Sequence, residues 1–183
     1  MDGVTPDSIL EFWYSAPLQK AWFSSTPELD SLIRDRYRGL WRRACEGGLD
    51  GWKASPEACL ALIVVLDQFP LNMFRGQAMS FASGDKAIAL TKYALEQGYQ
   101  QSLAKERLVF LYLPLMHSEN LDDQDWAVRL FEEAGFEDNV RFARHHREIV
   151  RKFGRFPHRN AILGRKSSPE EIEYLGSKEA FLG

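Results

Sequence analysis

The chain has 183 residues, of which 45% are hydrophobic and 27% charged, and this composition excludes an intrinsically disordered protein. Its formal net charge of −3 and its isoelectric point near 5.8 are at odds with the strong basic excess of a general nucleic-acid binder. The N-terminus lacks the basic and apolar regions of a secretory signal.

No run of about 18 uncharged apolar residues occurs, so the sequence predicts no membrane-spanning helix. Cys45 and Cys59 are the only cysteines, and both fall in patterns typical of helices. Two buried, reduced thiols are the simplest interpretation of such a pair. We therefore expect a cytoplasmic protein.

Four segments share one start signal for a helix, in which a Ser or Thr is followed by Pro and then by an acid. The hydroxyl suits the N-cap, the proline suits the first helical position, and the acid suits the positive end of the helix dipole. Glycines follow several of the helical patterns as stop signals. The start signals lie at residues 5–7, 26–28, 55–57 and 168–170.

Hydrophobic periodicity between these signals predicts an all-α protein, because no alternating run of β-branched residues indicates a strand. Short loops between the helices predict stacked antiparallel α-hairpins within a single domain, residues 1–183. The predicted helices span residues 6–14, 27–46, 56–68, 85–97, 103–115, 121–134, 137–153 and 169–175.

Two of these helices are apolar on every face, at residues 59–66 and 108–113. A helix without a polar face must be covered on all sides, so we expect both at the centre of the domain. A polar segment containing proline follows each of them, and a third such segment lies near the C-terminus. Candidate functional residues come from these three segments.

The first polar segment, residues 66–75, places Asp67 at the predicted C-terminal end of an apolar helix. The helix dipole disfavours a carboxylate there, so Asp67 needs a cation or hydrogen-bond donors. Arg75 and the C-terminal arginines are candidate partners. Asp67 is thus either a structural ion-pair residue or an acid in a pocket with a displaced pKa.

The second polar segment, residues 112–119, contains Pro114, which we expect to kink or end the central helix. His117 and Glu119 follow it directly. A His-x-Glu pair can ligate a metal, or the acid can orient the imidazole as a general base. Two ligands are too few for a zinc site, so no metal is predicted. The alternative is that Ser118 or Glu119 serves the start of the next helix.

The third polar segment is the densest in candidates. His146 interrupts an apolar stripe on the predicted helix 137–153, as a core histidine or as a functional one. Beyond this helix, Arg155, His158 and Arg159 offer planar donors that suit a phosphate or a carboxylate, and Asn160 follows them. They could equally form a solvated turn paired to acids.

A Phe-Pro dipeptide stands in both the first and the third segment, at residues 69–70 and 156–157. Each dipeptide precedes an asparagine, Asn72 or Asn160, that can cap a following turn. The repetition predicts two similar rigid corners.

The three segments together resemble the motifs of the domain-of-unknown-function family 924, whose members are mostly bacterial. The matching residues are 66–76, 113–119 and 153–165, and the likeness extends from residue 12 to the helix after residue 168. The resemblance implies an all-helical, tetratricopeptide-like fold and implies no reaction. Leu71 departs from the family pattern, which commonly has Arg at this position. If that Arg contacts a ligand, its absence weakens the first segment's share in the site.

Three functional hypotheses follow. In the first, the candidate residues converge on a pocket for a small anionic molecule, where arginines hold the anion and a His–carboxylate pair supplies acid–base function. In the second, the chain is a helical scaffold that binds a peptide or protein. In the third, the polar segments are structural locks between helix ends. The sequence names no cofactor, and it leaves open whether the chain is an enzyme. The candidates are Asp67, Arg75, His117, Glu119, His146, Arg155, His158, Arg159 and Asn160.

Overall fold

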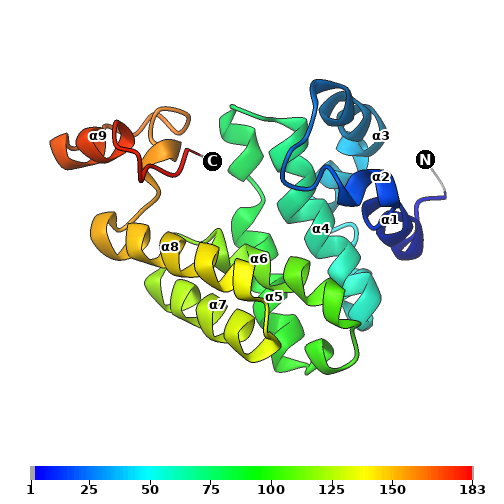
Figure 1. Ribbon diagram of the computed structural model, residues 1–183. Coiled ribbons are helices and arrows are strands. Elements are labelled where there is room, and N and C mark those ends of the chain that lie inside the picture. The colour runs from blue at the N-terminus through cyan, green and yellow to red at the C-terminus, as the bar shows by residue number, and fades with distance from the viewer. Residues whose placement is uncertain (1–2, 183) are drawn as a thin grey trace. The chain divides into compact units, whose positions relative to one another are not determined.

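The computed structural model describes residues 3–182 (Figure 1), and every regular element in that range is a helix. This confirms the all-α prediction, while tetratricopeptide-like stacking stays a prediction. Short 3₁₀ helices connect the α-helices at Asp50–Ala54, Ala78–Phe81, Tyr99–Gln101, Lys105–Arg107 and Pro157–Arg159. The α-helices are α1 (Pro6–Trp13), α2 (Ala16–Gln19), α3 (Pro27–Cys45), α4 (Pro56–Met73), α5 (Gly84–Glu96), α6 (Leu108–Met116), α7 (Leu121–Ala134), α8 (Glu137–Phe153) and α9 (Pro169–Leu175).

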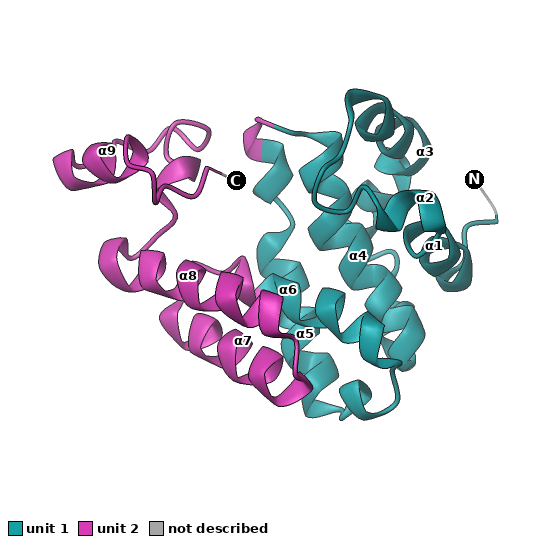
Figure 2. Ribbon diagram, viewed as in Figure 1, with its two compact units in different colours: residues 1–75, 79–114 teal, residues 76–78, 115–183 magenta. Residues whose placement is uncertain are grey.

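The described residues form two compact units (Figure 2). Unit 1 holds the residues up to 75 together with 79–114, and unit 2 holds 76–78 together with the residues from 115 onward. The predicted single domain of residues 1–183 stays a prediction.

All four predicted start signals open helices, because α1, α3, α4 and α9 each begin with the proline. The hydroxyls of Thr5, Thr26 and Ser168 each accept a hydrogen bond from the backbone N–H three residues later. Ser55 stands in the same position before α4 and makes no such bond. The start signal therefore works through proline and the dipole even where the hydroxyl does not cap.

Helix α4 is the core of unit 1, with α1, α3 and α5 packed against it. Every residue from Cys59 to Pro70 is buried, as expected for a helix without a polar face. By length and composition alone α4 could cross a membrane, but 78% of it is buried inside the protein. That burial is typical of a core helix.

Helix α4 runs to Met73, so the predicted end at residue 68 is wrong and Pro70 lies inside the helix. Proline has no N–H, which deprives the Leu66 carbonyl of its normal helical donor. The Ser83 hydroxyl replaces that donor, 2.6 Å from the Leu66 oxygen, and itself accepts the Trp41 indole N–H at 2.9 Å. A residue distant in sequence thus lets the helix continue.

Helix α6 likewise passes its proline and ends at Met116, two residues beyond Pro114. The predicted start at residue 103 is too early, since a 3₁₀ turn at Lys105–Arg107 precedes α6. Its residues from Phe110 to Met116 are buried. The prediction of a second, wholly apolar helix is therefore confirmed, with shifted bounds.

In unit 2, α7 and α8 form an antiparallel hairpin (Figure 1). Helix α8 buries His146, Ile149 and Val150 on one face. It ends at Gly154, whose φ of +70° is favoured only for glycine. This reversal carries the third polar segment back over the buried face of α8, where Phe156 is fully buried against Ile149 and Val150.

Candidate functional site

The nine predicted candidates divide between the units. Asp67 and Arg75 belong to unit 1, and the other seven belong to unit 2. The seven lie around the start of α7, the buried face of α8 and the turn that follows α8. They are His117, Glu119, His146, Arg155, His158, Arg159 and Asn160.

In unit 1, Asp67 and Arg75 have different partners. The Asp67 carboxylate accepts a hydrogen bond from the neighbouring Gln68 amide at 2.6 Å. The Arg75 guanidinium pairs with Asp30 of α3, with Nε 2.7 Å from Oδ2, and Asn72 donates to the same carboxylate at 2.8 Å. Arg75 therefore links the end of α4 to α3, so Asp30 takes the place of the expected partner Asp67.

In unit 2, Glu119 is held by the third polar segment. Arg165 approaches its two carboxylate oxygens at 2.6 and 2.9 Å, and the Phe156 N–H donates to one of them at 2.8 Å. Burial alone would raise the pKa of Glu119, but these hydrogen bonds outweigh it and hold the pKa below its ordinary value. Glu119 is thus an ionised anchor rather than a proton donor. The N-cap of α7 is Asn120. Ser118 also serves the start of this helix, because its hydroxyl accepts from the Asn120 N–H and donates to Asp123 in the first turn.

A second ion pair joins Arg155 to Glu171 of α9. The guanidinium donates to both carboxylate oxygens, at 2.7 and 2.9 Å, and Arg155 also donates to the Lys166 carbonyl. Hydrogen bonding from Arg155, assisted by the Ser168 N–H and by Asn160, lowers the pKa of Glu171 to about 2. Arg155 is therefore engaged as a structural donor within the protein.

Asn160 connects the two ion pairs. Its side-chain oxygen accepts from Arg165 Nε at 3.0 Å, and its amide nitrogen donates to Glu171 at 3.2 Å and to Ser167 at 3.1 Å. The side chain is almost fully buried, at 1% exposed, with both ends of its amide satisfied. These contacts agree with the hypothesis of structural locks for Glu119, Arg155 and Asn160.

His146 is the buried imidazole of α8, at 4% exposed. Its Nδ1 lies 2.8 Å from the Phe142 carbonyl oxygen, which can only accept, so Nδ1 carries the proton of the neutral ring and Nε2 is left as the basic atom. Burial, reinforced by the nearby charges of His117, His145 and Arg159, lowers the pKa of His146 to about 3. The ring is neutral at physiological pH.

His158 and Arg159 also lie close to Phe156. The His158 and His146 rings are centred 5.7 and 5.5 Å from the Phe156 ring, and the Arg159 guanidinium carbon lies 4.4 Å from that ring centre. His117 acts electrostatically on both other imidazoles. We call His117, His146, His158 and Arg159 the histidine cluster.

Positive charge dominates around His158. Burial and then Arg159 lower its pKa to about 4, with Arg165 and His117 acting in the same direction and Glu119 against them. Glu119 is bound by Arg165, and the charge of Arg159 also acts on the Glu119 carboxylate. The Nδ1 atom of His158 is buried and makes no hydrogen bond within the described part of the chain.

Sequence reasoning missed Arg165 and Glu171, which complete the two ion pairs. Arg165 is the last residue of the third family motif, so its place in that motif could have identified it as a site residue. Glu171 stands three residues after Ser168 and forms a capping box with it. Glu171 also accepts hydrogen bonds from Arg155 and Asn160, and no pattern in the neighbouring sequence predicts these contacts.

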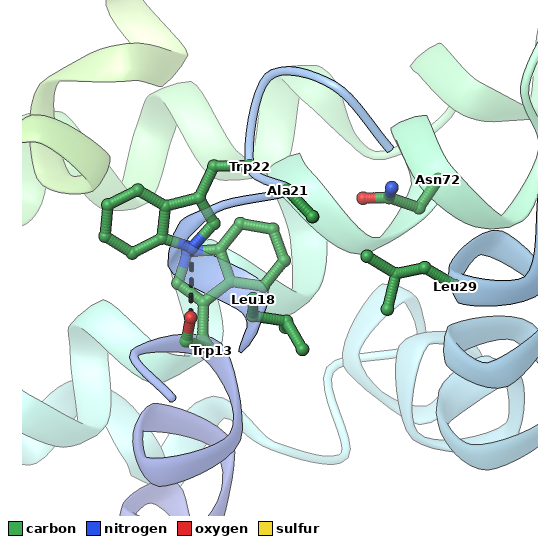
Figure 3. Close-up of a pocket in the computed structure, with 6 residues that line it drawn as sticks. All are labelled: Trp13, Leu18, Ala21, Trp22, Leu29 and Asn72. Carbon is green, nitrogen blue, oxygen red and sulfur yellow. Dashed lines mark hydrogen bonds between the residues drawn. The ribbon is translucent and has the colours of Figure 1, made fainter. Parts of the chain in front are cut away.

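A hollow is found in each unit. In unit 1, a narrow space lies between Trp13, Leu18, Ala21, Trp22, Leu29 and Asn72, with an empty volume of about 160 Å³ and no room for a water-sized sphere (Figure 3). In unit 2, an open cleft of about 290 Å³ is lined by Lys152, Phe153, Arg155, Ser168, Glu170 and Glu171. Across residues 3–182, no group of three or more His, Cys, Asp or Glu side chains is arranged to hold a metal ion.

The chain is similar to known proteins over nearly its whole length. A family model described as a bacterial protein of unknown function, DUF924, matches residues 9–179. The solved structure of a protein of unknown function from Agrobacterium tumefaciens is 39% identical, covers 93% of this chain and 96% of its own, and superposes with a TM-score of 0.88. A comparison with curated proteins finds no match. The chain belongs to the DUF924 family of bacterial proteins of unknown function.

Proposed function

We propose that this protein binds a small anionic molecule at the histidine cluster of unit 2. The observation that carries the proposal is the gathering of one guanidinium and two imidazoles around Phe156. The Arg159 guanidinium carbon lies 4.4 Å from the Phe156 ring centre, and the ring centres of His158 and His146 lie 5.7 and 5.5 Å from it. Guanidinium and imidazole N–H groups suit a carboxylate or a phosphate.

The proposal narrows the set of residues that contact the ligand. Glu119, Arg155 and Asn160 are committed to one another and to Arg165 and Glu171. Their role is to fix the turn that presents His158 and Arg159. The ligand contacts are then His117, His158 and Arg159, with His146 behind them as a neutral, oriented imidazole.

A thermal-unfolding series in inorganic phosphate tests the proposal. Ligands that bind only the folded state raise the melting temperature by mass action, so Tm should rise with phosphate concentration at constant ionic strength. Arg159→Ala should abolish the rise. Arg141→Ala is the matched control, because Arg141 is a well-exposed arginine of α8 that pairs with Asp138.

Two results contradict the proposal. The first is a Tm that does not change with phosphate in the wild-type protein. The second is a rise that persists undiminished in a folded Arg159→Ala variant, which would place the anion elsewhere. Sodium chloride at the same ionic strength distinguishes specific binding from general salt effects.

One observation favours a second candidate function, the binding of a peptide or protein at unit 1. Phe23 is 74% exposed, although its ring stacks on Phe110 at 6.5 Å beside Trp22. Exposed aromatic residues are common anchors of protein interfaces. Selection of peptides against the protein tests this alternative, which predicts ligands whose binding is lost in Phe23→Ser and kept in Leu32→Ser, at the exposed Leu32.

A further inference from the structure

The open cleft of unit 2 has a volume of about 290 Å³, close to the lower end of the range for small-molecule pockets, roughly 300–1,000 Å³. None of its lining residues belongs to the histidine cluster. They come from the last turn of α8, the turn that follows it and the start of α9, and they are Lys152, Phe153, Arg155, Ser168, Glu170 and Glu171. The cleft is therefore a second place in unit 2 that can receive a small molecule.

Two of the four charges that line the cleft compensate each other. The Arg155 guanidinium donates to both carboxylate oxygens of Glu171, at 2.7 and 2.9 Å. Glu171 is only 3% exposed and also accepts from the Ser168 N–H. This ion pair thus joins the turn to α9 as a wall of the cleft, and neither of its charges calls for a ligand.

The other two charges, Lys152 and Glu170, have no such compensation. Both side chains are exposed, and neither takes part in an ion pair within residues 3–182. The Lys152 ammonium lies 5.0 Å from the centre of the Phe153 ring, a contact that attracts a cation without neutralising it. One positive and one negative group that line the same cleft are thus left for a ligand.

Phe153 supplies the apolar part of the lining. Its ring is half-buried and packs on Tyr174, with the ring centres 5.1 Å apart. It also packs against the buried group of Ile149, Val150 and Phe156. The ring is therefore held in place from behind, so that an apolar group of a ligand meets a fixed surface between the two charges.

We infer that the cleft binds a free amino acid in its zwitterionic form. The carboxylate of the amino acid pairs with Lys152, its ammonium group pairs with Glu170, and its apolar side chain contacts Phe153. A simple anion would bring its charge into a cleft that holds the unpaired carboxylate of Glu170, and a simple cation would do the same at Lys152. This inference goes beyond the proposed anion site, because it uses different residues and needs both signs of charge.

Three ligands with similar carbon skeletons test the inference in NMR titrations of the full chain at neutral pH and constant ionic strength. L-leucine carries both charges, 4-methylpentanoate lacks the ammonium group, and 3-methylbutylamine lacks the carboxylate. An exposed ion pair contributes little, so leucine should bind about threefold to fivefold more tightly than either analogue. The amide signals of Phe153 and Gly154 should shift with leucine concentration.

Two charge variants assign the groups of the ligand to residues. Lys152→Gln should weaken leucine about threefold to fivefold and leave 3-methylbutylamine unchanged. Glu170→Gln should weaken leucine to the same extent and leave 4-methylpentanoate unchanged. Lys166→Gln and Glu173→Gln are the matched controls, because both residues are exposed neighbours that do not line the cleft. The controls should keep the affinity of the wild type for all three ligands.

Several results would overturn the inference. They are an absence of shifts at the cleft with leucine, equal affinities for leucine and its two analogues, or leucine binding that is unchanged in both charge variants. Loss of leucine binding in Arg159→Ala would also overturn it, by moving the ligand to the histidine cluster. A failure of phosphate to bind contradicts the proposed anion site alone, so the two hypotheses fail separately.

Discussion

Asn160 shows how one neutral side chain can organise several charged ones. Glu119 precedes α7 and Glu171 lies in α9, and each forms an ion pair with a different arginine. Asn160 bonds to Arg165 of one pair and to Glu171 of the other. Loss of one member of such a network leaves partly buried polar groups without partners, which costs more than the loss of an isolated surface pair.

The Glu119→Gln substitution tests this network. It removes the charge that faces Arg165, so the free energy of unfolding should fall by about 1.5–3 kcal/mol, the range for hydrogen bonds to charged groups. Glu132→Gln is the control, because Glu132 pairs with Arg144 in a more exposed setting. It should change stability by less than about 0.5 kcal/mol. If the two substitutions lower the free energy of unfolding in urea by the same amount, the network is not coupled.

His146 predicts a specific pH dependence of stability. Its pKa is about 3 in the folded protein and ordinarily near 6.5, so between these values the unfolded chain binds a proton that the folded chain does not. The contribution of the neutral ring is complete above pH 6.5 and is lost progressively as the pH falls toward 3. The slope is at most about 1.4 kcal/mol per pH unit for one imidazole.

Unfolding in urea at several pH values checks this expectation. His146→Gln stays neutral throughout, so its stability should fall less steeply than that of the wild type from pH 6.5 to 4.5. In this window Glu119 and Glu171 change the free energy of unfolding little. Their folded-state pKa values are lowered, so the stability that they contribute is lost only when the pH falls below the ordinary carboxyl pKa. Parallel slopes for the two proteins would contradict the assignment of His146 as a buried neutral base.

Sequence identified most residues of the site but not their pairing. His146 stood out because it interrupts an apolar stripe, and Glu119, Arg155 and Asn160 stood out as polar residues beside proline. Their partners could not be read locally, since Glu119 and Arg165 are 46 positions apart.

At the scale of elements, the same dipeptide has two structures. Phe69-Pro70 lies inside α4, whereas Phe156-Pro157 begins a 3₁₀ turn after the left-handed Gly154. The prediction of two similar corners is therefore wrong. The difference depends on Ser83, whose hydroxyl supplies the hydrogen bond that Pro70 cannot give.

Ser83→Ala tests that explanation. The substitution leaves the Leu66 carbonyl and the Trp41 indole N–H without this partner in a buried site, so stability should fall by about 1–3 kcal/mol. Amide hydrogen exchange should quicken in the last turn of α4. Ser24→Ala is the control within unit 1, because the Ser24 hydroxyl makes only an exposed, long hydrogen bond. Unchanged exchange in α4 would mean that Ser83 does not support the helix past Pro70.

Helix starts were predictable because their determinants are local. Proline at the first position and an acid in the first turn act within a few residues, and four such signals open four helices. Helix ends beyond Pro70 and Pro114 were not predictable in the same way. Whether a helix survives its proline depends on tertiary donors and packing.

At the scale of the molecule, total charge conceals local charge. The chain is acidic, with a net charge of −3, yet two arginines, Arg159 and Arg165, act on His158 and lower its pKa. Composition correctly indicated a globular chain and could not reveal this local field, because it arises from which side chains fold together. The same all-helical architecture occurs in the Agrobacterium tumefaciens structure. The functional hypothesis thus depends on a few side chains of unit 2.

The pKa of His158, followed by NMR of its imidazole during a pH titration, tests the anion site most directly. Without a ligand the pKa should be low, about 4, because of burial and the charge of Arg159. With saturating inorganic phosphate it should rise toward its ordinary value, since a nearby negative charge favours the protonated ring. Arg159→Ala should remove the dependence on phosphate. A His158 pKa that is identical with and without phosphate in the wild-type protein would contradict the proposed anion site.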